Sequence, residues 1–202
     1  MSNTVTVTSA GSEMKLYTAQ PTGAAKGAVI VIQEAFGMTD HIKDICDRTA
    51  AAGYLAVAPH VFHRTGDPLI SYENMRDVMP HLMALNRADT EADLKACFDY
   101  LAGQGFKGRQ VGIVGFCMGG SISFFAGAEW ELGAAVTYYG GGIAHGRFGL
   151  PGLAELAPGL KTPWQGNFGD LDQSIPVTEV EQLREAAAKA GVATEVNRYA
   201  EA

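Results

Sequence analysis

The stretch GRQVGIVGFCMGGSISF, residues 108–124, joins a strand-like apolar run to a helix-like apolar run through a glycine-rich turn. Its centre, GFCMG at residues 115–119, has the form G-x-nucleophile-x-G. This pattern is typical of a sharp strand-to-helix turn that holds a nucleophile in strained backbone geometry above a sheet. The two flanking glycines are needed because the strand and the helix pass very close there. The sequence therefore predicts a nucleophile elbow with Cys117 at its tip.

The predicted helix begins at the thiol. Its N-terminal dipole favours a thiolate, so the pattern predicts a lowered pKa for Cys117 and leaves the Met118 backbone N–H free to donate to an oxyanion. The alternative interpretation is a small buried cysteine in a glycine-rich turn. Cys46 and Cys97 fit that alternative, because each lies on the apolar face of a predicted helix. A phosphate-binding loop is a poor match, since the GK[ST] ending is missing.

Strand-like and helix-like segments alternate along the rest of the chain. After an opening hairpin with its turn near Gly11, we expect strands at residues 28–32, 54–60, 110–116, 132–142, 162–170 and 193–202. We expect helices at residues 40–53, 72–85, 90–104 with Thr90 as the cap, 118–128 and 178–191. This alternation predicts an α/β fold, a mostly parallel sheet with helices on both faces, in a single domain over residues 1–202.

Ligands of such sheets bind outside the carboxyl ends of the strands. The polar and nucleophilic residues that the predicted strand ends place there are Gln33, Glu34, His60, Cys117, Tyr139, Gly140, Asp170 and Asp172. These residues are the candidates for a functional site.

The composition excludes several classes of function. The net charge of −7 and the absence of a basic run argue against nucleic acid as a partner, because an acidic surface repels phosphates. No apolar run reaches membrane-spanning length, and the first ten residues lack the features of a secretion signal, so we expect a cytoplasmic protein without a membrane partner. Three cysteines without a CxxC pair predict no metal site, and we expect no cofactor.

Four motifs occur in an order and at a spacing that resemble the dienelactone hydrolases, a branch of the α/β-hydrolase fold with a cysteine nucleophile. They are VIQEAFG at 31–37, GFCMGG at 115–120, VTYYGGG at 136–142 and GDLDQSIP at 169–176. The resemblance covers nearly the whole chain. It implies a hydrolase that cleaves a small ester or lactone through a cysteine thioester acyl-enzyme. We expect a small-molecule substrate and a monomer or homodimer.

The resemblance assigns catalytic roles to three side chains. Cys117 matches the nucleophile, and Glu34 matches a glutamate that accepts the thiol proton as substrate binds. Asp172 matches the acid that orients the catalytic histidine, because it lies four residues before Pro176 as in the family's G-x-x-D-x-x-[IV]-P pattern. Asp170 is expected to act in a turn or cap.

Backbone groups and substrate contacts also follow from the resemblance. It implies an oxyanion hole made by the N–H groups of Ala35 and Met118. It further implies arginines that hold a substrate carboxylate. Arg76 lies at a similar spacing from the cysteine, with Arg64 as the alternative, although solvated loop arginines would look the same. Tyr139 and His60 are further candidates for lining the substrate pocket.

The family's catalytic histidine follows the last strand, in a motif like A-G-H-G/S-F. Here the sequence stops at Ala202, about two residues short of that position, and none of the five histidines lies there. His60 and His145 are expected on the active-site side of the sheet, yet neither follows the acid in the order that the triad requires. We expect the natural chain to continue past Ala202 with this histidine and a final helix, both absent from the sequence given.

Three functions remain open at this point. The first is an ester or lactone hydrolase that uses Cys117. The second is a catalytically impaired member of the same fold that keeps the pocket and binds a ligand. The third is a thiol-based redox or acyl-transfer enzyme, which is weakened because Cys46 and Cys97 are expected to be buried on helices.

Overall fold

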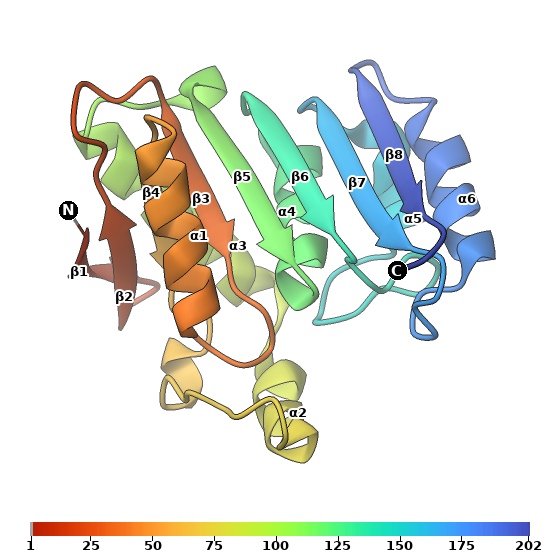
Figure 1. Cartoon of the computed structure of the whole chain (residues 1–202), viewed down its shortest axis with the longest axis horizontal. Helices are drawn as coiled ribbons and strands as arrows, with labels where there is room; N and C mark the ends of the chain where they lie inside the picture. Colours follow the sequence, from red (N-terminus) through yellow and green to blue (C-terminus); the bar gives the residue numbers. More distant parts are fainter. Residues whose placement is uncertain (1) are drawn as a thin grey trace.

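A computed structural model describes residues 2–202 as one eight-stranded sheet with flanking helices (Figure 1). The strands are β1 (Ser2–Ser9), β2 (Ser12–Ala19), β3 (Ala28–Ile32), β4 (Leu55–Pro59), β5 (Val111–Phe116), β6 (Ala134–Tyr138), β7 (Trp164–Gly169) and β8 (Thr194–Tyr199). The helices are α1 (Asp40–Ala51), α2 (Met75–Ala84), α3 (Arg87–Gly103), α4 (Met118–Glu129), α5 (Leu153–Leu156) and α6 (Val177–Ala187), with short 3-10 helices η1 (His63–Thr65), η2 (Gly108–Gln110) and η3 (Ala157–Gly159).

The strand order is β1-β2-β4-β3-β5-β6-β7-β8. β1 and β2 form the expected antiparallel hairpin, which joins β4 in antiparallel register, and all pairs from β4 to β8 are parallel. The predicted α/β fold is therefore confirmed. Because six parallel strands share one direction, the segments after Ile32, Phe116, Tyr138 and Gly169 all leave the same edge of the sheet.

The cap of α3 differs from the prediction. The helix begins at Arg87, and Asn86 is the N-cap, with its side-chain oxygen accepting the Asp89 N–H at 3.0 Å. Thr90 lies one turn further along, inside the helix and buried. The prediction of a Thr90 cap was wrong because Asn86, four residues earlier, offers a better capping oxygen.

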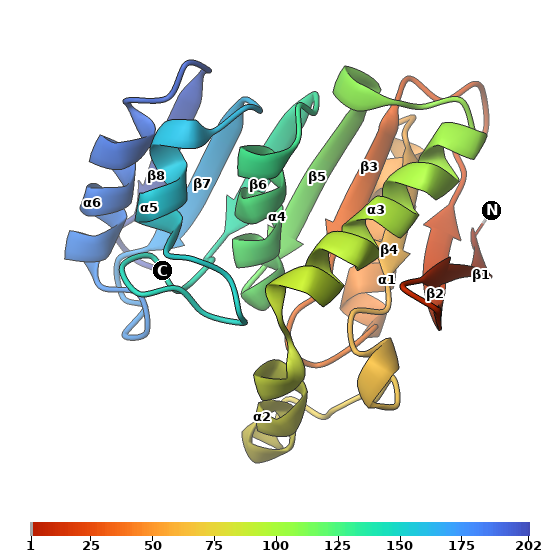
Figure 2. The same cartoon turned by 180° about the vertical axis from the view of Figure 1, so that it is seen from behind.

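The two faces of the sheet are covered unequally. Helices α3, α4, α5 and α6 lie on one face (Figure 2), whereas α1 alone of the described helices lies on the other, over β2, β3 and β4 (Figure 1). Val111 and Ile113 of β5 are consequently buried, while Val114 and Phe116 on the α1 side are partly exposed. β4 is buried on both of its faces, whereas β5 is fully buried on one face only. No helix within residues 2–202 is long and apolar enough to cross a bilayer.

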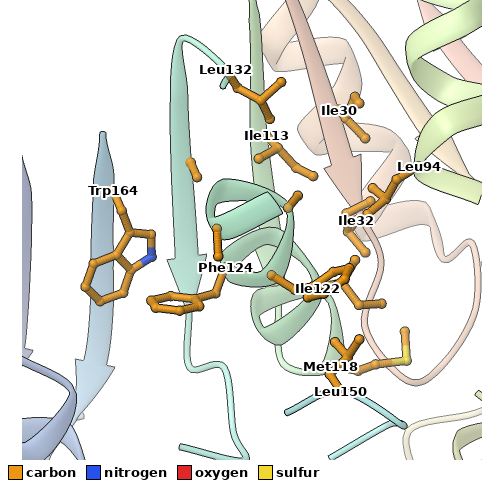
Figure 3. Packing of buried hydrophobic residues seen from close by; sticks show 14 of the residues in the cluster. Ile30, Ile32, Leu94, Ile113, Met118, Ile122, Phe124, Leu132, Leu150 and Trp164 are labelled. Atoms are coloured by element: carbon orange, nitrogen blue, oxygen red, sulfur yellow. The ribbon is translucent and has the colours of Figure 1, made fainter. Parts of the chain in front are cut away.

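Helix α4 forms the centre of the main hydrophobic core. Every residue from Met118 to Ala128 is buried. Figure 3 shows Phe124 of α4 beside Trp164 of β7. The two rings pack edge-on, with their centroids 4.9 Å apart. The Trp164 indole N–H donates to the buried Thr137 hydroxyl at 3.0 Å, so the one polar atom of the ring is satisfied. This packing fixes the start of α4 relative to the sheet.

Glycines allow α4 to start directly against three strands. A Cβ on Gly115 would lie 1.8 Å from the Gly119 carbonyl oxygen, and a Cβ on Gly119 would lie 2.5 Å from the carbonyl oxygens of both Ile32 and Gln33. A Cβ on Gly120 would lie 2.6 Å from the Tyr138 oxygen. Each of these contacts is with backbone, which cannot move aside without shifting a strand. The N-terminus of α4 is therefore held at the carboxyl edge of β3, β5 and β6.

We predict that Gly115→Ala loses about 3 kcal/mol of folding free energy or more, because the added methyl group overlaps the α4 backbone. Gly112→Ala, in the same strand, is the matched control. Its Cβ would meet nothing closer than 3.7 Å, so its stability should stay within about 1 kcal/mol of the parent. Urea unfolding followed by circular dichroism measures both. Equal stability of the two variants would contradict the close-approach argument.

Candidate active site

Cys117 lies at the strand-to-helix turn that the sequence pattern predicts. Its φ is +55° and its ψ is −118°, a conformation that costs a non-glycine residue about 1–3 kcal/mol. The surrounding hydrogen bonds maintain it. The Cys117 N–H donates to the Tyr138 carbonyl at 3.0 Å, and the Cys117 carbonyl accepts from the Gly120 N–H at 2.9 Å. The elbow is therefore tied to β6 on one side and to α4 on the other.

The electrostatics of the thiol contradict one expectation from the sequence. Burial raises the pKa of Cys117, and the negative charges of Glu34 and Asp172 raise it further. The Met118 backbone N–H and the positive charge of Arg147 lower the pKa, but burial is the larger influence. The predicted lowering was wrong because a helix N-terminus acts against desolvation and two carboxylates at this position. The thiol is therefore protonated at neutral pH, and its reaction needs a proton acceptor.

The other two cysteines are buried completely. Cys46 lies on α1 and Cys97 on α3, with no exposed area. Burial raises the pKa of Cys46 to about 12 and raises that of Cys97 as well. Cys117 is only half-buried. It is thus the accessible thiol among the described residues.

Glu34 lies two residues after the end of β3, and two tyrosines hold its carboxylate. The Tyr139 hydroxyl donates to Oε1 at 3.2 Å, and the Tyr72 hydroxyl donates to Oε2 at 3.0 Å. No hydrogen bond joins Glu34 to the Cys117 thiol within the described residues, although its charge acts on that thiol. Tyr139 was a sequence candidate, and its backbone lies in the left-handed region with a φ of +41°. Tyr72 was missed, because nothing in the irregular stretch around it distinguishes it.

One candidate oxyanion amide, that of Met118, belongs to the elbow, and the other, that of Ala35, belongs to the turn after β3. The Met118 N–H is the first of α4, and it lowers the pKa of the Cys117 thiol. Ala35 is buried in the turn after β3, and no backbone carbonyl of residues 2–202 accepts from its N–H. The contact of Gly119 with Gln33 brings these two segments together. A pair of amide donors beside a thiol is what a developing oxyanion needs.

Asp172 and Asp170 lie in the loop after β7 and do different things. The Asp172 carboxylate accepts from the Ser174 N–H at 2.8 Å and from its hydroxyl at 2.7 Å, and its charge reaches the Cys117 thiol. Asp170 instead accepts from Nε and Nη2 of the Arg198 guanidinium, each at 2.7 Å, which joins the loop after β7 to β8. The prediction for Asp170 named a turn or cap role and did not include this ion pair of its side chain.

The histidines lie elsewhere. The Nδ1 of His60 is 2.8 Å from the Asp67 carboxylate, so this candidate is paired away from the thiol. His145 is exposed in the loop after β6. The ring of His41 packs edge-on against Phe116 with centroids 6.2 Å apart. Within residues 2–202, no histidine is hydrogen-bonded to Cys117 or Asp172.

A different arginine from the one expected acts on the thiol. Arg76 is exposed on α2 and makes no ion pair with the described residues, while Arg64 is paired with Asp93 at 2.9 Å. The charge of Arg147 acts on Cys117, and its guanidinium lies against Gly141 in the loop after β6. Sequence analysis missed Arg147, although the glycine-rich motif it follows places it at the correct edge of the sheet.

The side chains around the turn after β5 determine which chemistry the site can perform. Among residues 2–202, no three His, Cys, Asp or Glu side chains are grouped as a metal ion would require. The groups that converge on the turn after β5 are one thiol, two carboxylates, two phenols, two amides and one guanidinium. This set suits attack of a thiol on a carbonyl group.

Comparisons with known proteins agree with this geometry. A sequence model described as "Dienelactone hydrolase family" matches residues 14–202. A Yersinia pestis protein named "Putative carboxymethylenebutenolidase" is 35% identical over 203 residues, which cover 98% of this chain and 75% of the relative. A protein of the same name from Escherichia coli K12 is 34% identical over 204 residues, which cover 97% and 74%.

Solved structures give the same result. The crystal structure titled "Putative Dienelactone Hydrolase" from Klebsiella pneumoniae superposes with a TM-score of 0.88 at 32% identity, covering 100% of this chain and 86% of that one. A dienelactone hydrolase-like phosphotriesterase from metagenomic libraries has a TM-score of 0.80 at 21% identity, which shows a shared fold. It covers 98% of this chain and 81% of that chain.

Proposed function

Because the chain belongs to the dienelactone hydrolase family, a family of hydrolases, we propose that it cleaves a small carboxylic ester or lactone through a thioester at Cys117. The observation that carries the proposal is the strained backbone of Cys117 beside the Met118 N–H. A chain does not keep such a conformation at a half-buried thiol for packing alone, since glycine would relieve the strain.

In the proposed reaction, the thiol proton moves to Glu34 and the sulfur attacks the carbonyl carbon of the ester. The N–H groups of Ala35 and Met118 stabilise the oxyanion. The carbon–oxygen bond to the alcohol then breaks, the alcohol oxygen takes up the proton that Glu34 received, and the acyl group remains on Cys117 as a thioester. Water hydrolyses the thioester, which restores the thiol and releases the acid. In a lactone, the alcohol and the acid are the two ends of one molecule.

We predict that p-nitrophenyl acetate leaves one acetyl group per chain on Cys117, because attack needs only groups described here whereas deacylation also needs a base to activate water. Intact-protein mass spectrometry with peptide mapping measures the product. Cys117→Ala should abolish it, and the control variants Cys46→Ala and Cys97→Ala should keep it. Acetylation that survives in Cys117→Ala, or no acetylation in the parent, would favour the ligand-binding alternative.

A histidine whose ring N–H donates to the Asp172 carboxylate completes the proposed reaction. The geometry at the end of β8 supports this arrangement. The Ala202 carbonyl accepts from the Leu171 N–H at 2.7 Å, so position 202 is beside the residue that precedes Asp172. A histidine a few residues after position 202 would therefore lie next to this acid.

We expect that extending the chain after Ala202 by a segment that places a histidine beside Asp172 raises steady-state hydrolysis of p-nitrophenyl acetate by about 100-fold or more. In that extended protein, Asp172→Asn should remove most of the gain, because it loses the acceptor that orients the histidine. Asp170→Asn is the matched control, since Asp170 binds Arg198 instead. Equal effects of the two variants would remove Asp172 from the mechanism.

Arg147 is the residue we propose for a carboxylate on the substrate, ahead of the sequence candidate Arg76. A guanidinium binds a carboxylate through two parallel hydrogen bonds, and Arg147 has no ion-pair partner within the described residues. The Ser121 hydroxyl holds the Gly141 carbonyl at 2.8 Å, which fixes the loop that carries it. Tyr139 lies on the same side of the site, because its hydroxyl donates to Glu34. His60 contacts Asp67 and none of the site residues named above.

We predict that Arg147→Gln slows acylation by the p-nitrophenyl monoester of succinic acid about tenfold, while acylation by the uncharged p-nitrophenyl butyrate changes less than twofold. Stopped-flow release of p-nitrophenol measures both rates. Arg76→Gln is the control, and both of its rates should remain close to the parent's. A uniform loss with both esters would show that Arg147 does not read the charge of the substrate.

A further inference from the structure

The segment around α2 rests on the turn that carries Glu34. The Ile70 N–H donates to the Phe36 carbonyl at 3.0 Å. The side chains of Ile70 and Val78 form a small buried cluster with Ala35, separate from the main core. Figure 1 shows α2 beyond the carboxyl edge of the sheet, outside the two layers of helices. The α2 segment is thus a local support for the turn at residues 34–37.

Tyr72 makes the polar contact between this support and the site. Its ring lies against Phe36 with centroids 4.3 Å apart, and its hydroxyl donates to Glu34 Oε2 at 3.0 Å. With Tyr139 on Oε1 at 3.2 Å, each carboxylate oxygen of Glu34 accepts one phenol. Burial and the charge of Glu34 raise the pKa of Tyr72 and of Tyr139, so both phenols stay protonated and remain donors.

Transfer of a proton to Glu34 disturbs this arrangement. The arriving proton turns one carboxylate oxygen into a hydroxyl, which is a poorer acceptor, so one of the two phenol bonds weakens. In addition, Glu34 has no hydrogen bond to Cys117 in this structure, so its carboxylate has to turn from a phenol toward the sulfur. Both steps are opposed by the two tyrosines.

We propose that Tyr72 is a positioning residue that restrains Glu34 and thereby limits proton transfer from the Cys117 thiol. The inference rests on the proposed role of Glu34 as proton acceptor. It makes Tyr72, and through it the α2 segment, a control on the reactivity of a residue far away in the sequence. Tyr139 acts on the same carboxylate from the loop after β6.

The test is the alkylation rate of Cys117 by iodoacetamide at neutral pH in the 202-residue protein, followed by peptide mass spectrometry. Tyr72→Phe keeps the ring against Phe36 and removes only the donor. We expect alkylation to become about three- to tenfold faster, the range of one net hydrogen bond. Tyr54→Phe is the control and should leave the alkylation rate unchanged. Tyr54 is also partly exposed, and it directly precedes β4, at the end of that strand away from the site.

A double variant separates this role from a structural one. Glu34→Gln by itself should slow alkylation, because the variant lacks the carboxylate that receives the thiol proton, and equal or faster alkylation would count against that role of Glu34. Adding Tyr72→Phe to Glu34→Gln should then change nothing. A gain that persists in the Glu34→Gln background, or no gain in Tyr72→Phe alone, overturns the inference. If Glu34→Gln also leaves the rate unchanged, the role of Glu34 in the proposed function fails as well, so the two failures can be told apart.

Discussion

The close approach of β5 and α4 is the constraint on which the rest of the structure depends. Only glycine fits at position 115, where a Cβ would overlap the Gly119 carbonyl. Because the two elements pass at this distance, the single residue between strand and helix has to turn sharply, and Cys117 takes a positive φ. The start of α4 also lies against the carboxyl end of β3, at the carbonyl groups of Ile32 and Gln33. The geometry of the thiol and both candidate oxyanion amides thus follow from one backbone packing requirement.

The electrostatics of the site follow from what surrounds the elbow. Two carboxylates, Glu34 and Asp172, act on a half-buried thiol, and together with burial they outweigh the effects of the helix N-terminus and Arg147. Ionisation of Cys117 in isolation is therefore unfavourable. A protein that uses this thiol needs an adjacent group to receive the proton. Glu34 is a neighbouring carboxylate whose charge raises the pKa of the thiol. The two tyrosines that donate to Glu34 therefore also affect this proton transfer.

The sequence was sufficient for the fold and for the main chain of the site. Alternating apolar runs predicted the strands and helices, and the glycine spacing around Cys117 predicted the elbow, because both are local consequences of backbone geometry. The pKa of the thiol was predicted in the wrong direction, since it depends on burial and on charges from residues 34 and 172, which only the folded sheet brings together. Tyr72 and Arg147 were not predicted, because both lie in loops without hydrophobic periodicity.

The central claim is that Cys117 carries the acyl group with its carbonyl oxygen between the Ala35 and Met118 amides. A crystal structure of the protein after reaction with a small activated ester tests this directly. The account predicts a thioester on the Cys117 sulfur, with the acyl oxygen about 2.7–3.1 Å from both amide nitrogens. An acyl group on another residue, or an acyl oxygen turned away from both amides, would contradict it.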